Sequence, residues 1–422
     1  MTGHVITLNA GSSSIKFALF DGATCLASGL VEELHDKRHI VVHGHADATA
    51  QGDPGATAHD DPGGATAQGD SSATPQGEAG GATAHDVSWS AATPFHADAL
   101  TRILEWCRTA FPHVQIAAAG HRVVHGGVHY VSPVVVTDEV LDGLRTLIPL
   151  APLHEPHNIA GILAAREAWP DVPQVACFDT AFHRSHPFVN DVFALPRRFY
   201  DEGVRRYGFH GLSYEYVSGR LRQIAPLHAA GRVVVAHLGN GASMCAIRDG
   251  QSVASSMGFT ALDGLPMGTR CGQLDPGVVL YLMQAKHMTA EQIADLLYRE
   301  SGLKGLSGIS HDMRELEESD RPEAREAIEY FVFRIRRELG GLAAVLKGID
   351  AVVFCGGIGE HAWQVRERVL EGMEWIGVEL DRGANQAGAQ VISTERSRVR
   401  VFVIPTDEEA MIAHHTNAVL NA

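Results

Sequence analysis

Two segments of the sequence share one pattern, and this repetition restricts the folds that the chain can adopt. Each segment predicts a strand, a turn of small residues and a second strand that is followed by Asp-Gly. In the first segment these are Val5–Leu8, 9–14 and Ile15–Phe20. In the second they are Arg232–Ala236, 237–242 and Ser243–Arg248. Aligned without gaps, the segments match at Val5/Val233, Gly11/Gly239 and Ala18/Ala246. The match indicates either a chance likeness of two hairpins or two similar domains.

Strand-like and helix-like patterns alternate along the rest of the chain, which is typical of α/β proteins. Apolar residues recur at helical spacing over Ala97–Thr109, Ile159–Trp169 and Glu323–Lys347. The chain has 422 residues, more than the ~250–300 that one hydrophobic core usually supports. We therefore predict two α/β domains.

The segment from Gly44 to Asp86 differs from the rest in composition. It contains no Lys, Arg, aromatic or large aliphatic residue, and an imperfect octad such as ATAQGDPG recurs within it. Such a segment cannot bury enough apolar surface to offset its conformational entropy. We predict a disordered low-complexity insertion over residues 44–86, with a tether or a His-assisted metal-binding segment as the alternative.

Charge and cysteine content restrict which partners the protein can bind and which cellular compartment suits it. With 34 Lys plus Arg against 50 Asp plus Glu, the net charge is −16, which disfavours nucleic acid and anionic membranes as partners. The six cysteines stand singly, as reduced thiols usually do. The N-terminus lacks an export signal, and no apolar run reaches the ~18 residues of a transmembrane helix. We expect a soluble, cytoplasmic protein.

Three glycine-containing turns could bind phosphate groups. They are Asn9–Ser14, which precedes Lys16, then His237–Gly241, and Gly356–Glu360 after the apolar strand 351–354. Backbone N–H groups in such turns approach phosphate oxygens closely. None matches GxxxxGK[ST] or GxGxxG. One such turn is weak evidence, but three at corresponding places of two domains favour a nucleoside triphosphate as ligand.

A more specific resemblance comes from nine motifs, which occur in the order NAGSSSIKF, GHRVVHGG, APLHEPHN, CFDTAFH, RYGFHG, HLGNGAS, MGTRCGQLDPG, FCGGIGEH and IPTDEEAMIA. From Val5 to about Ala413, outside the insertion, the chain resembles the acetate kinase family of the acetate/sugar kinase, heat-shock chaperone and actin superfamily. The resemblance implies two duplicated actin-like (ribonuclease H-like) α/β domains with an ATP-binding cleft between them. Their expected extents are 1–182, with 406–422 returning, and 183–405.

The resemblance also implies a reaction and its residues: reversible, Mg²⁺-dependent phosphoryl transfer from ATP to acetate, giving acetyl phosphate and ADP. Arg122 matches the residue that binds the substrate carboxylate, and a guanidinium fork suits that bidentate anion. Val124, Leu153 and Phe209 match the methyl pocket. Asp179, His210 and Arg270 match catalytic positions. At His210 and Arg270, hydrogen-bond donors can follow charge onto the transferred phosphoryl group. Asp179 follows the strand Val175–Phe178, and either proton transfer or orientation is open to it.

The remaining matched positions concern ATP/ADP and metal. Nucleotide contacts carry over to Lys16, His237, Leu238, Gly239, Asn240, Gly241, Asp312, Met313, Arg314, Gly356, Gly357, Ile358, Gly359 and Glu360. Asn9 and Glu408 match the positions that bind Mg²⁺, or alternatively Mn²⁺, and one carboxylate with one amide is chemically sufficient for that ion. The family is typically a homodimer, so we expect one here.

The chain departs from the family's motifs at a few positions. His154-Glu155-Pro156 replaces HNP, Cys271 and Gln273 change GTRSGD, and His361 changes GIGEN. Ala261 replaces the pocket Pro of TPLEGL, so a propionate or butyrate kinase remains an alternative. A non-catalytic, nucleotide-gated module like actin is a second alternative. That module would need neither Arg122 nor Arg270.

Overall fold

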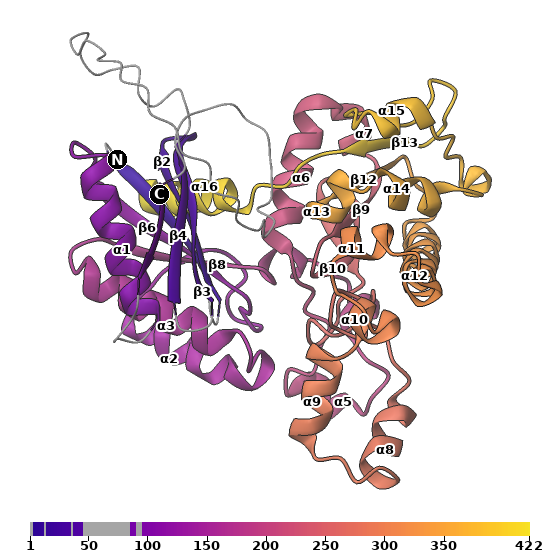
Figure 1. Ribbon diagram of the computed structural model, residues 1–422, viewed down its shortest axis with the longest axis horizontal. Coiled ribbons are helices and arrows are strands. Elements are labelled where there is room, and N and C mark those ends of the chain that lie inside the picture. Colours follow the sequence, from indigo (N-terminus) through magenta and orange to yellow (C-terminus); the bar gives the residue numbers. More distant parts are fainter. Residues whose placement is uncertain (1–2, 12–13, 35–36, 45–84, 90–94) are drawn as a thin grey trace, which may run out of the picture.

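The computed structural model describes residues 3–11, 14–34, 37–44, 85–89 and 95–422. It shows two lobes, each with its own β-sheet (Figure 1). The eight-stranded sheet contains β1 (His4–Ala10), β2 (Ser14–Asp21), β3 (Thr24–Leu34), β4 (Lys37–Gly44), β5 (His85–Trp89), β6 (Ile116–Val123), β7 (Val134–Val135) and β8 (Gln174–Phe178). The five-stranded sheet contains β9 (Arg232–Leu238), β10 (Ala242–Arg248), β11 (Gln251–Ser255), β12 (Ala351–Cys355) and β13 (Arg400–Val403).

The two sheets share one five-strand arrangement. The orders β3-β2-β1-β6-β8 and β11-β10-β9-β12-β13 correspond strand for strand. In each, the first three strands form an antiparallel meander and the last two continue parallel to the third. The predicted duplication is therefore confirmed at the level of topology.

The gap-free alignment of the two hairpins needs one correction. Ala10 pairs with Ile15 in the first hairpin, whereas Leu238 pairs with Ala242 in the second. The second turn is thus one residue shorter, so the second strands are displaced by one position relative to the alignment. Because side chains alternate between the faces of a sheet, Cys245 rather than Ala246 is the counterpart of Ala18.

Helices pack against the sheets and also extend beyond them (Figure 1). They are α1 (Phe95–Ala110), α2 (Asp138–Leu147), α3 (Glu155–Ala168), α4 (Phe188–Asp191), α5 (Arg197–Asp201), α6 (Gly211–Ile224), α7 (Pro226–Ala229), α8 (Pro276–Gln284), α9 (Ala290–Arg299), α10 (Gly302–Ser307), α11 (Met313–Glu318), α12 (Pro322–Leu346), α13 (Gly356–His361), α14 (Trp363–Leu370), α15 (Arg382–Gln386) and α16 (Glu408–Asn421). Short 3₁₀ helices span Ile148–Leu150, Ala181–His183 and Glu374–Ile376. This layering buries near-continuous apolar strands such as β8 and β12.

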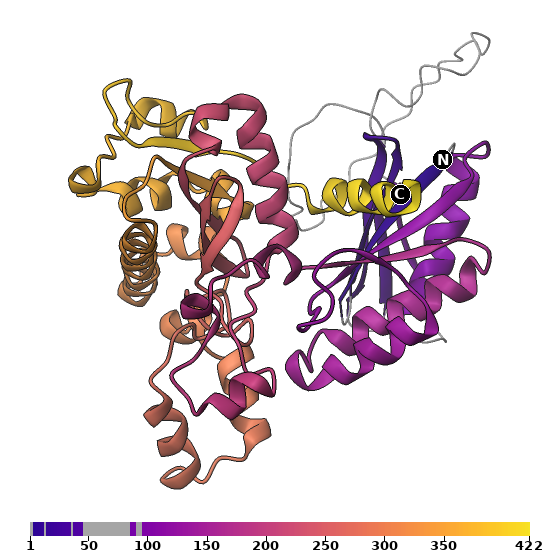
Figure 2. The same ribbon diagram turned by 180° about the vertical axis from the view of Figure 1, so that it is seen from behind.

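The last helix of the chain returns to the first lobe. Helix α16 packs against β1, β6 and β8, and it also contacts α6, which covers a face of the second sheet (Figures 1 and 2). His415 of α16 lies 2.9 Å from Glu215 of α6. The pair α6–α16 therefore joins the lobes. The exact boundaries at 182/183 and 405/406 stay a prediction.

Several predicted elements are confirmed and three need correction. The three predicted helices correspond to α1, α3 and α12. His237 and Leu238 belong to β9 rather than to a turn, and Gly356–Glu360 forms most of α13 rather than a loop. The insertion predicted from 44 to 86 ends earlier, because His85 begins β5, which pairs with β4. Residues 45–84 of it lie outside the described residues.

In the described part of the chain, no helix combines the length and apolar character needed to cross a membrane.

Candidate active site

A buried ion pair stands at the centre of the candidate site. Strands β6 and β8 are parallel neighbours, with Arg122 opposite Cys177, so Arg122 faces the residue that follows β8, Asp179. Arg122 Nη2 donates to Asp179 Oδ2 at 2.6 Å, and Nε lies 3.1 Å from both carboxylate oxygens. The Asp179 side chain is 1% exposed, while that of Arg122 is 20% exposed. A forked contact of this kind fixes the plane of the guanidinium.

The charges around this pair are strongly coupled. Burial alone would lower the pKa of Arg122, but the carboxylates of Asp179 and Glu408 outweigh it and raise that pKa, so Arg122 is a permanent cation. Burial raises the pKa of Asp179, and the neighbouring Arg122 opposes that rise. The ion pair thus offsets the cost of burying the carboxylate.

The residues predicted to hold a metal lie beside the same guanidinium. Asn9 Oδ1 is 3.4 Å from Arg122 Nη1, and Glu408 Oε2 is 3.7 Å from Arg122 Nε. Glu409 follows Glu408, and burial together with Glu408 raises the pKa of the Glu409 carboxyl. Asp179, Glu408 and Glu409 thus place three carboxyl groups around the guanidinium of Arg122. An amide oxygen and a carboxylate in an acidic surrounding fit Mg²⁺, which takes few protein ligands. Among described residues, no cluster of three His, Cys, Asp or Glu suits a metal ion.

His210 is held by a chain of hydroxyl groups. It adopts a left-handed conformation with φ of 57° directly before α6. Its Nδ1 lies 2.8 Å from Ser243 Oγ, which also contacts the hydroxyl of Tyr214. If Tyr214 donates to Ser243 and Ser243 donates to Nδ1, the ring carries its proton on Nε2. Burial, with His237, Arg122 and Arg270 nearby, lowers the pKa of His210 well below its ordinary value, so the ring is neutral.

Arg270 lies close to His210. A Cβ at Gly241 would stand 3.2 Å from His210 Nε2 and 3.9 Å from Arg270 Nη1, so glycine keeps this approach open. Within the described part of the chain, the Arg270 side chain makes only long contacts, 3.4 Å to the Ala261 carbonyl and 3.7 Å to Met267 Sδ. Among described residues it has no carboxylate partner within ion-pair distance. Arg270 is thus a cation whose fork is free for an anionic ligand.

The predicted nucleotide motifs converge on one side of the second sheet. Strand β9 is hydrogen-bonded to β12, which places the β9–β10 turn beside the start of α13. Gly356 has φ of 75° and stands against the backbone of Leu238, where a side chain would collide. The Gly268 N–H donates to the Asn240 carbonyl at 3.1 Å, which adds the MGTRCG motif. Glu360 Oε1 accepts from the N–H groups of Gly356 and Thr406 and so ties α13 to the entrance of α16.

His237 connects this group to His210, one of the predicted catalytic residues. Its ring stacks on His210, with ring centres 4.3 Å apart. Its Nδ1 contacts Ser213 Oγ at 2.8 Å, and Ser213 contacts Thr406. Burial lowers the pKa of His237, so both stacked rings are neutral.

The remaining predicted nucleotide residues differ in burial and in their partners. Asp312 caps α11 and pairs with the exposed Arg314 at 2.6 Å, which lowers the pKa of Asp312. Met313 is buried in the core of the second lobe. Lys16 is exposed on β2, opposite Asn9.

The predicted acyl pocket is only partly assembled. Val124 and Phe209 belong to one buried apolar cluster, and Ala261 packs against it. Leu153 is 37% exposed and lies outside that cluster. The structure therefore brings two of the three predicted pocket residues together.

Two further residues support the site, and motif comparison alone assigned them no role. Asn158 accepts from the N–H of Val124 and donates to the Ala10 carbonyl, which ties β1 to the end of β6. Arg366, 1% exposed, donates to the Gly359 and Glu360 carbonyls and holds the end of α13. Both stand inside or beside recognised motifs, but only their contacts reveal what they do.

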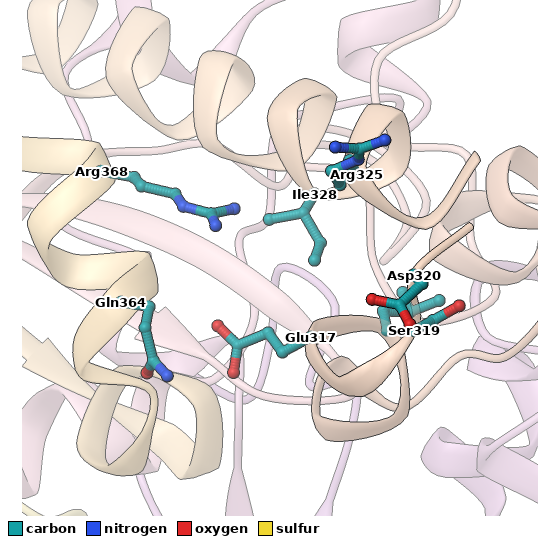
Figure 3. Close-up of a pocket in the computed structure, with 8 residues that line it drawn as sticks. Glu317, Ser319, Asp320, Arg325, Ile328, Gln364 and Arg368 are labelled. Carbon is teal, nitrogen blue, oxygen red and sulfur yellow. The ribbon is translucent and has the colours of Figure 1, made fainter. Parts of the chain in front are cut away.

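A well-defined hollow lies elsewhere. It has a volume of about 270 Å³ and is lined by side chains of α11, α12 and α14, including Glu317, Arg325 and Arg368 (Figure 3). Neither Arg122, His210 nor Arg270 lines it. It is therefore separate from the site described above.

Comparison with known proteins agrees with this geometry. A sequence model of the acetokinase family matches residues 79–414. The chain belongs to the acetokinase family. It is 70% identical to an acetate kinase of Methylocella silvestris, over 100% of this chain and 99% of that protein. It is 52% identical to one of Rhodopseudomonas palustris, over 98% of both.

Two solved structures share the fold of this chain. The crystal structure of Porphyromonas gingivalis acetate kinase matches with a TM-score of 0.83 at 36% identity, covering 99% of this chain and 100% of that one. A propionate kinase from Francisella tularensis matches with a TM-score of 0.85 at 32% identity, with the same coverage. The family and the two duplicated actin-like domains predicted from the motifs are thereby confirmed.

Proposed function

We propose that this chain transfers the γ-phosphoryl group of ATP to acetate at the site around Arg122, His210 and Arg270. The observation that carries the proposal is that two arginines from different lobes act on the same buried ring: Arg122 from the first sheet and Arg270 from the second lobe both influence His210 electrostatically, and they influence each other. In the forward direction an acetate oxygen forms the new bond to phosphorus, and the bond between phosphorus and the β–γ bridging oxygen breaks. ADP leaves, and acetyl phosphate is the product.

Asp179 acts by orientation in this proposal. Acetate is already ionised at neutral pH, so it needs no base. Asp179 is engaged by the Arg122 fork through both oxygens, which turns the outer edge of the guanidinium toward the substrate. The structure thus favours orientation over proton transfer, the alternative that the sequence left open.

His210 and Arg270 stabilise the transferring group. The Nε2 edge of His210 faces Gly241, and Arg270 Nη1 lies on the same side. A neutral N–H donor beside a cation can follow negative charge onto the equatorial phosphoryl oxygens. Stacking of His210 on His237 holds its ring plane.

Asn9 and Glu408 would hold Mg²⁺ at the edge of this group. The ion would neutralise phosphate charge during transfer. Among the described residues, the one ion pair of Glu408 is its 3.7 Å contact with Arg122 Nε. Its carboxylate is therefore available to the ion.

Acetate is favoured as acceptor over propionate. The relatives named acetate kinase are 70% and 52% identical, whereas the propionate kinase is 32% identical. Trapping acyl phosphate with hydroxylamine, in parallel reactions with acetate, propionate and butyrate, tests both acceptor and chemistry. Formation of acetohydroxamate together with ADP supports the proposal, and ADP release without hydroxamate contradicts it.

The chain also acts as a homodimer in this proposal. Helix α8 contains no buried residue although its sequence is PGVVLYLMQ, and Leu280 and Tyr281 are more than half exposed. An apolar helix with this exposure is typical of a subunit interface. Light scattering of the wild type and of Leu280→Glu tests it: we expect a dimer that the charge splits, and a monomeric wild type contradicts the idea.

Location in the cytoplasm is the final part of the proposal. All six cysteines are unpaired, and burial raises the pKa of Cys107, Cys177, Cys245 and Cys355. Free thiols of this kind suit a reducing compartment.

A further inference from the structure

Glu155 is the departure from the family's motifs with the most unusual surroundings. It is the first residue of α3, and its side chain is fully buried. Neither Oε1 nor Oε2 has a partner with good hydrogen-bond geometry among the described residues, and the His125 backbone is the one group that favours the ionised form of this carboxyl. A buried carboxylate without partners is costly, so such a group either holds a proton or serves a ligand.

The start of α3 borders the substrate side of the site. His154, directly before Glu155, interacts electrostatically with both Arg122 and Arg270. One turn after Glu155, Asn158 holds the N–H of Val124 in the acyl pocket. The Glu155 carboxyl itself interacts with Asp179 and lies near the backbone of His125. It therefore stands next to the group that orients the substrate-binding guanidinium.

A second orphaned polar atom accompanies it. The Gly127 N–H donates to His125 Nδ1, so the proton of that neutral ring is on Nε2. His125 Nε2 is buried and has no partner among the described residues. Its ring packs edge-on against Tyr207 and Phe209. The N–H donor of His125 and the carboxyl group of Glu155 are thus both buried without a well-formed hydrogen bond near the predicted acyl pocket.

We propose that Glu155 is a positioning residue of the substrate side: its carboxyl group is neutral when the substrate carboxylate binds, and its ionisation expels that carboxylate. The inference rests on the proposed function, because it concerns the same substrate. A second negative charge next to Asp179 would offset Arg122, the cation that binds acetate. ATP binds chiefly through the second lobe in the proposed site, so its affinity should not respond.

The electrostatics of the neighbouring groups support this reading. Burial raises the pKa of Glu155 to about 8, with Asp179 adding to the rise and the His125 backbone opposing it. Burial lowers the pKa of His125 to about 3 and that of His154 to about 4, so both stay neutral above pH 7. Arg122 stays charged, while burial lowers the pKa of His96, which stacks on His157 between α1 and α3. Burial thus raises the pKa of Glu155, whereas it lowers the pKa of His125, His154 and His96.

The test is the pH dependence of acetate binding in the full-length enzyme. From a pKa near 8, the KM for acetate should rise about 25-fold between pH 7.5 and 9.5, while kcat and the KM for ATP change little. In Glu155→Gln the KM for acetate should be flat over this range. Glu155→Asn, which restores the family's usual residue, should behave like Glu155→Gln. Glu317→Gln, in the separate hollow of Figure 3, is the matched control and should follow the wild type.

Two kinetic results would overturn the inference: a flat wild-type profile of the KM for acetate, or a Glu155→Gln profile that follows the wild type. Thermal unfolding gives an independent readout. An acid that is protonated in the fold and ionised in the unfolded chain makes the wild type lose stability relative to Glu155→Gln as pH rises from 5 to 8. A constant difference contradicts the inference. Failure of the wild type to form acetyl phosphate at pH 7 would instead contradict the proposed function.

Discussion

Replacing Arg270 by alanine should reduce turnover severely while leaving the fold and nucleotide binding nearly intact. To described residues, its side chain donates only over 3.4 Å to the Ala261 carbonyl and 3.7 Å to Met267 Sδ. Its removal leaves no buried carboxylate unpaired, so we expect the free energy of unfolding to change by about 1 kcal/mol or less.

The effect on the rate is much larger. An arginine that stabilises the transferring phosphoryl group contributes roughly 10³–10⁵ in kcat. At about 1.4 kcal/mol per factor of ten, this corresponds to about 4–7 kcal/mol of the activation barrier. Because the contact forms in the transition state, the KM for ATP should stay within a few-fold.

The assay combines hydroxamate formation, ADP release and thermal unfolding for wild type, Arg270→Ala and Arg270→Lys. Arg396→Ala removes an exposed arginine paired with Glu379 and is the matched control. Arg270→Lys keeps the charge without the fork and should recover part of the loss. A folded Arg270→Ala enzyme with kcat within tenfold of wild type would remove Arg270 from the proposed chemistry.

Three further predictions follow from the same contacts. Arg122→Ala should abolish saturation of the enzyme by acetate. It should also lower the free energy of unfolding by about 3–5 kcal/mol, because Asp179 then remains buried and unpaired. A urea denaturation curve that matches the wild type would contradict this. Deleting Ala46–Ala84 and joining the ends by a short turn should leave activity and Tm unchanged, since β4 and β5 are antiparallel with Val42 opposite His85; insoluble or inactive protein would show that the segment is needed. Ala261→Pro should raise the acetate-over-propionate ratio of kcat/KM, with a ceiling of about 10–200-fold for one methylene, because Ala261 packs against the cluster containing Val124 and Phe209; an equal or lower ratio would refute the pocket argument.

The sequence by itself determined the two-domain α/β architecture and the family. Alternating apolar strands, small-residue turns and helical spacing are local signals, and they placed β1, β2, β9, β10 and α12 to within a few residues. The ordered motifs predicted roles for Arg122, His210 and Arg270 because each motif is a run of a few adjacent residues, and these roles stay predictions. The conformation of GGIGE was read wrongly as a loop, since glycine-rich turns and the first turn of a helix look alike in sequence.

Only the tertiary structure decided how these residues cooperate. The forked contact of Arg122 with Asp179 arises because β6 and β8 are parallel neighbours, and that pairing favours orientation as the role of Asp179. The chain Tyr214–Ser243–His210 and the bridge from Asn158 to Ala10 likewise join segments far apart in sequence. Glu155 showed in the sequence only as an altered letter, because burial and the lack of partners are properties of its surroundings. Local patterns specify which elements form, whereas charge, burial and hydrogen bonding at the site depend on which distant residues the fold brings into contact.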